Sequence, residues 1–98
     1  MTPEQKKLAR HALGLPNKTR RAYRNYYVIG MDSPPHADWV LMVADGLAIM
    51  SSARHEIYGG MDIFWLTRAG AEAAAHKGEK LEKWYPGDTK PGSVTQAA

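Results

Sequence analysis

The apolar residues near the N-terminus recur at three- and four-residue spacings between positions 8 and 13, as on one face of a helix. Thr2 and Gln5 stand where a capping box places its two polar side chains. Gly14 follows the last apolar residue, at a position where helices commonly end in a left-handed conformation. The pattern predicts a helix over residues 3–13.

The next two apolar segments have different periods. Residues 25–30 are rich in aromatic and β-branched side chains and predict a strand. Apolar residues recur at helical spacing over 35–45, and Gly46 ends this second helix. Because the helix carries few polar residues, we expect most of it to be buried.

A hairpin follows the second helix. Residues 48–52 and 61–66 predict two strands, and Gly59 with Gly60 supplies the positive-φ positions of the turn between them. We expect the resulting sheet to be covered on both faces.

A third helix is predicted to begin at Thr67, whose hydroxyl can cap it. Its many alanines favour a helix, and its small side chains allow a close approach to the sheet. The pattern also allows the helix to extend to Trp84, with Leu81 as a second anchor and Glu79 and Lys83 as an ion pair one turn apart.

The elements occur in the order α-β-α-β-β-α, which predicts a small α+β domain with a three-stranded, mostly antiparallel sheet and flanking helices. Residues 16–24 are compatible with either a short helix or an exposed basic loop. We expect one globular domain over residues 1–85 and a flexible C-terminal tail over 86–98, because the tail is polar and contains proline and glycine.

Positive charge is concentrated at the N-terminus. Residues 1–24 hold seven Lys and Arg against one Glu, a net charge of +6, whereas residues 25–98 hold six basic against nine acidic residues, a net charge of −3. Such an asymmetric field attracts a polyanion to the N-terminal part, although a solvated basic face is an equally good interpretation.

Arginine and tyrosine alternate over residues 20–27, a combination that suits phosphate contact and base stacking. Alternatively, the tyrosines form the core while the arginine stems cover its edge. The candidate nucleic-acid-binding residues are Lys6, Lys7, Arg10, Arg20, Arg21, Arg24 and, in the hairpin loop, Arg54.

Other kinds of chemistry lack support in the sequence. The chain has no Cys, and its four His residues have no metal-ligand spacing, so we expect no metal site and no cofactor. Ser51, Ser52 and His55 lack the third partner and the strained turn of a nucleophilic site, so we expect no catalytic residues. No apolar run is long enough to span a membrane, and no signal peptide is recognisable. We therefore expect a cytoplasmic protein.

Two resemblances are visible. The segment from Gly46 through the hairpin to residues 64–70, FWLTRAG, resembles the C-terminal half of winged-helix DNA-binding domains. Residues 8–15, 23–26, Gly46-Leu47 and 66–70 together resemble a group of small phage and prophage proteins of uncharacterised function. The resemblances imply a winged-helix-like fold and a viral or mobile-element accessory protein, located in the host cytoplasm.

We therefore predict a non-enzymatic accessory protein that binds nucleic acid, with DNA favoured. The second helix contradicts a groove-reading role, which needs exposed Arg, Lys, Asn or Gln. The alternative is a protein-binding module, such as an inhibitor or adaptor of a host machine or a minor virion component. Its candidate partner-binding residues are Tyr23, Tyr26, Trp84 and Tyr85.

Overall fold

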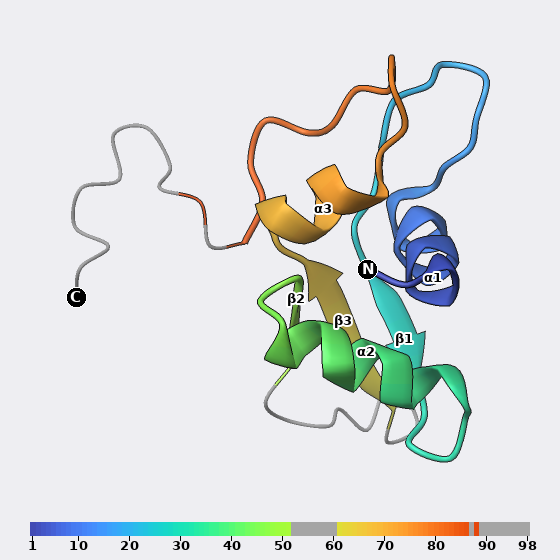
Figure 1. Cartoon of the computed structure of the whole chain (residues 1–98), viewed down its shortest axis with the longest axis vertical. Coiled ribbons are helices and arrows are strands. Elements are labelled where there is room, and N and C mark those ends of the chain that lie inside the picture. Colours follow the sequence, from blue (N-terminus) through green and yellow to red (C-terminus); the bar gives the residue numbers. More distant parts are fainter. Residues whose placement is uncertain (52–60, 87, 89–98) are drawn as a thin grey trace.

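A computed structural model describes residues 1–51, 61–86 and 88 of the chain. Within these residues the order of elements is α-β-α-β-β-α, as predicted (Figure 1). The elements are α1 (Pro3–Leu13), β1 (Tyr27–Ile29), α2 (Pro35–Ala44), β2 (Ala48–Met50), β3 (Asp62–Leu66) and α3 (Arg68–Ala74).

The three strands form one sheet in the order β1-β3-β2, and both pairings are antiparallel. The predicted α+β class and three-stranded sheet are thus confirmed, and the arrangement is compatible with a small winged-helix-like domain. Tyr27, Phe64 and Met50 are direct partners across the sheet and so share one face. Ile49 pairs with Trp65, one position along, and these two residues belong to the opposite face.

The core lies on the Phe64 face of the sheet, where α2 crosses the strands and α1 lies beside β1 (Figure 1). The Trp39 ring of α2 is fully buried and stacks on Phe64, with 5.4 Å between ring centroids. Tyr27 also contacts Trp39, with 5.2 Å between the ring centroids. Aromatic burial of this kind dominates the stability of a small core, so these rings join the sheet to α2.

The residues that the sequence predicts to cap the two ends of α1 do so in the structure. The Thr2 hydroxyl accepts from the Gln5 amide at 3.1 Å, and the Gln5 side chain accepts from the Thr2 amide at 3.0 Å. Gly14 adopts φ 81°, and the Leu15 amide reaches back to the Arg10 carbonyl at 2.9 Å. The helix therefore begins and ends at the predicted residues.

The outer face of α2 differs from the prediction. Only Trp39 and Met42 are buried in this helix, whereas Val40 and Leu41 are 45% and 56% exposed. The expectation that most of α2 is buried is wrong, because one sheet face and α1 cover a single side of the helix. The second face of the sheet is likewise covered only in part, since Ile63 is buried but Ile49 is exposed.

The helix α3 ends at Ala74 rather than extending to Trp84. A turn closes between His76 and Glu79, and Gly78 within it has φ 86°. The Glu79 carboxylate accepts from the His76 amide at 2.6 Å instead of pairing with Lys83 along a helix. Alanine content favoured a longer helix, but these contacts fix a turn.

Residues 16–24 form a loop, which answers the question that the sequence left open. The Asn17 side chain organises this loop by donating to the carbonyls of Gly14 and Arg21, both at 2.9 Å. Among the described residues α2 is the only helix between β1 and β2, whereas a winged helix has two helices packed as a helix-turn-helix before its wing. The predicted turn at Gly59-Gly60 and the candidate Arg54 lie outside the described residues.

The close approach of α3 depends on Gly70. A Cβ atom on this residue would lie 1.9 Å from the Leu47 carbonyl oxygen and 3.1 Å from a Leu66 methyl carbon. The first contact is with backbone, which cannot rotate away as a side chain can.

We therefore expect Gly70→Ala to lower the free energy of unfolding by about 1–3 kcal/mol, as overpacking does. Gly30→Ala is the matched control, since its new Cβ would meet only the Met61 side chain, at 3.9 Å. Urea denaturation of both variants measures the difference. Equal stability of the two variants would show that α3 does not need this close approach.

Candidate nucleic-acid interface

Two segments far apart in the sequence join at one end of the molecule. The Ala22 amide donates to the Lys80 carbonyl at 2.9 Å, and the Lys80 amide donates to the Arg20 carbonyl at 2.8 Å. The Arg20 guanidinium adds a bond to the Lys77 carbonyl at 2.7 Å. The loop before β1 and the segment after α3 therefore lie side by side, at the top of Figure 1.

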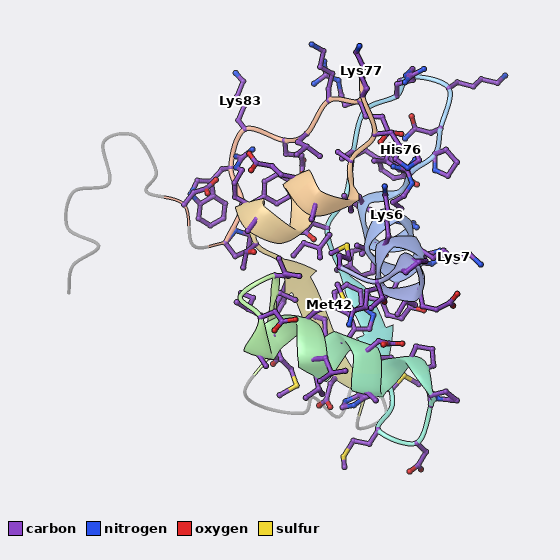
Figure 2. All side chains as sticks on the ribbon, in the orientation of Figure 1. Lys6, Lys7, Met42, His76, Lys77 and Lys83 are labelled. Carbon is purple, nitrogen blue, oxygen red and sulfur yellow. The ribbon has the colours of Figure 1, made fainter. Side chains whose placement is uncertain are left out.

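This end of the molecule is rich in exposed cations, and we call it the basic end. Figure 2 shows Lys77 and Lys83 projecting outward from it. The exposed acidic side chain in these two segments is Glu82, since Glu79 is turned towards α1. The basic end consists of Lys18, Arg20, Arg21, Lys77, Lys80 and Lys83, all exposed.

Arg10 does not belong to this surface, which corrects its assignment as a phosphate contact. Its guanidinium forms a two-fold hydrogen bond with the Glu79 carboxylate, at 2.6 and 2.7 Å, and also donates to the Ala74 carbonyl at 3.0 Å. The two side chains are 11% and 5% exposed. Hydrogen bonds from Arg10 lower the pKa of the Glu79 carboxyl to about 2. Arg10 is therefore a structural residue, whose donors are used inside the protein.

The other predicted cations are divided between locations. Arg20 and Arg21 lie in the basic end, whereas Lys7 projects from α1 in another direction and Lys6 is half-buried (Figure 2). Arg24 is half-buried, lies over the Tyr23 ring at 5.4 Å and donates to the His11 carbonyl at 2.8 Å. The structure thus brings only part of the predicted set together.

Three further cations of this surface, Lys77, Lys80 and Lys83, were not predicted from the sequence. These lysines lie in the half of the chain with net negative charge and alternate with Glu79 and Glu82, so local charge gave no signal. The three lysines form a positively charged surface because Arg10 pairs with the Glu79 carboxylate and holds it away from them. That pairing spans 69 residues and cannot be recognised from local spacing.

Three of the four predicted partner-binding aromatics are exposed, and one is not. Tyr23, Tyr26 and Trp84 are 62%, 52% and 45% exposed. Tyr85 is fully buried, and burial raises the pKa of its phenol group. Its hydroxyl accepts from the Glu82 amide at 3.2 Å, so the assignment of Tyr85 to a partner surface is wrong.

Arg68 holds the segment after Tyr85 in place. Its guanidinium lies 4.8 Å from the centroid of the Tyr85 ring and donates to the Asp88 carboxylate at 2.9 Å. Hydrogen bonds from Arg68 lower the pKa of Asp88. Contacts with the domain therefore reach Asp88, past the predicted boundary at residue 85.

Three shallow hollows follow one another from the basic end across the second face of the sheet. Their volumes are about 570, 520 and 300 Å³. The first hollow includes Arg21, Lys83 and Trp84 in its lining. Trp84 and Glu82 also line the second hollow, and Asn25 and Trp65 line both the second and the third.

The described residues contain no group of three His, Asp or Glu side chains placed to hold a metal ion. His36 and Asp62 form a pair at 2.7 Å on the core side of the sheet. No helix in the described part of the chain is long and apolar enough to cross a membrane.

Comparisons of the chain with models of protein families, with curated proteins and with solved structures found no match.

The Arg10–Glu79 pair gives stability a defined pH dependence. The pKa of Glu79 is about 2 in the folded protein against an ordinary value of 4.5. The pair's contribution is therefore complete above pH 4.5 and is lost as the pH falls towards 2. We expect Glu79→Gln to lower the free energy of unfolding by about 3 kcal/mol at pH 7, because it leaves a buried guanidinium unpaired.

Denaturant unfolding of the wild type and Glu79→Gln from pH 7 to pH 2 tests this expectation. The difference between the two should shrink as the pH falls from 4.5 towards 2, because the Glu79 carboxyl is protonated near pH 4.5 in the unfolded chain and only near pH 2 in the folded protein. Glu82→Gln is the control, since that carboxylate is exposed and has no side-chain partner among the bonds described above. A difference that stays constant to pH 2 would contradict the assignment.

Proposed function

We propose that the protein binds nucleic acid, with DNA favoured, through the basic end. The observation that supports this proposal is the convergence of six exposed cations from two distant segments, whose described residues include one exposed carboxylate, Glu82. A concentrated field of one sign attracts a polyanion and speeds its association. Phosphate is the most abundant target for such a field, and Lys and Arg are its usual ligands.

The described residues favour contact with phosphates over reading of base edges. The exposed side chains in the middle of α2 are Val40 and Leu41, which cannot form the hydrogen bonds of direct readout. Binding should therefore depend strongly on salt and weakly on sequence. In line with the resemblance to phage proteins, we propose an accessory protein that acts in the cytoplasm of a host cell.

Protein binding is the second candidate function, and the outer face of α2 favours it. Val40 and Leu41 are exposed next to Ala37 and Ala44, so one side of this helix is apolar. Exposed apolar surface of this kind often marks a site for a protein partner. Tyr23 and Trp84 remain candidates for such contacts, as aromatics are common at interaction hot spots.

The three lysines of the basic end give the sharpest test. Replacing Lys77, Lys80 and Lys83 together by Gln removes three charges while sparing Arg20 and Arg24, whose guanidinium groups bond to backbone. We expect the slope of log affinity against log salt to decrease by up to about 3, at about 0.9 per phosphate contact. Fluorescence anisotropy with labelled DNA from 50 to 300 mM salt measures this slope.

The same three lysines replaced by Arg form the matched control. This variant keeps the charge and should retain both the affinity and the salt slope, whereas both should decrease in the Gln variant. If wild type and the Gln variant bind DNA equally, the basic end is not the interface. No binding of the wild type at 50 mM salt would reject nucleic-acid binding and leave protein binding as the function to pursue.

A further inference from the structure

The three hollows adjoin one another, because each neighbouring pair shares lining residues, and we call this row of hollows the groove. Trp84 and Glu82 join the first hollow to the second, and Asn25 and Trp65 join the second to the third. The groove begins beside Arg21 at the basic end and runs over the sheet face that carries Ile49 and Trp65.

Aromatic side chains recur along this groove. Trp84 is 45% exposed where the first two hollows meet, Trp65 is half-buried where the second and third meet, and Tyr26 is 52% exposed in the third. Val28 and Ile63 line the floor beyond them, so the far end is apolar. Proteins that bind single-stranded nucleic acids combine a positively charged groove with aromatic side chains on which bases stack, and here the cations lie at one end of the groove.

We propose that this groove binds a single-stranded nucleic acid, whose phosphates contact Arg21 and Lys83 while unpaired bases stack on Trp84 and Trp65. The inference rests on the proposed function and specifies its ligand. Bases in a duplex are stacked on one another and paired, so their faces are not available to these rings. A duplex would reach the cations of the basic end without using the groove.

The polar groups of the groove indicate recognition without sequence preference. The Asn25 side chain is already hydrogen-bonded within the protein. Its amide donates to the Leu66 carbonyl at 3.0 Å, and its oxygen accepts from the Leu66 amide at 2.9 Å. Stacking tolerates any base because every base has a π-face. Glu82 is the exception, because it lines two hollows and its negative charge would oppose a phosphate bound there.

Two substitutions with opposite expected effects test the groove. Trp84→Ala should weaken binding of a short oligo(dT) by roughly 5- to 100-fold, the range for loss of one stacked base, and leave duplex binding within about twofold. Trp84→Phe should restore most of the loss. Glu82→Gln should strengthen oligo(dT) binding, and this gain of affinity cannot result from misfolding.

The readouts are anisotropy with oligo(dT) and with a duplex of equal length, together with quenching of tryptophan fluorescence by oligo(dT). Leu41→Ala is the control, since it removes an exposed apolar side chain from α2, outside the groove residues. Stronger binding of oligo(dT) than of duplex, lost in Trp84→Ala and raised in Glu82→Gln, is the expected result.

The remaining outcomes separate the two proposals. If the duplex binds as well as oligo(dT) and both groove variants behave like the wild type, the groove inference is overturned while binding at the basic end stands. If neither ligand binds the wild type at 50 mM salt, the proposed function fails and the groove inference fails with it. Loss of binding to both ligands in a folded Trp84→Ala variant would also overturn the single-strand assignment.

Discussion

The pairing of Arg10 with Glu79 is the interaction on which the arrangement of α1 and of the segment after α3 depends. One guanidinium reaches the Glu79 carboxylate and the Ala74 carbonyl, and so ties α1 to the end of α3 and to the turn that follows. With this turn fixed, Lys80 pairs with the loop before β1. The same pair neutralises a carboxylate that would otherwise lie among the lysines of the basic end. An internal contact therefore determines the charge of an external surface.

Elements whose signals are local could be predicted from the sequence. Two helices begin at hydrogen bonds between residues only three positions apart. These bonds are the capping box of Thr2 and Gln5 and the bond from the Gly70 amide to the Thr67 hydroxyl. The order of elements and the antiparallel hairpin follow from apolar periods and turn residues in the same way. The end of α3 could not be predicted, because alanine content favours a longer helix while Glu79 takes part in contacts 69 residues away in sequence.

The candidate site was predictable only in part, because contacts between distant parts of the chain also decide which of its residues are exposed. Arg10 and Arg21 look alike in the sequence, yet one is buried against Glu79 and the other is exposed beside Lys80. Trp84 and Tyr85 are neighbours, but the structure exposes the first and buries the second completely. Composition indicates which residue types can bind a polyanion. Only the tertiary contacts decide which of them remain available to do so.

The surface of α2 limits how any nucleic acid could be recognised. A helix that reads base edges needs polar side chains on its exposed face, and α2 presents Val40 and Leu41 instead. The described part of the chain places the cations of the basic end and the hollowed aromatic surface elsewhere, around the segments 18–26 and 77–84. Although the sheet order is compatible with a winged helix, the helix before the hairpin has the wrong chemistry for the groove-reading role. In this molecule, phosphate attraction and aromatic stacking are the interactions that the exposed side chains can supply, and neither depends on that helix.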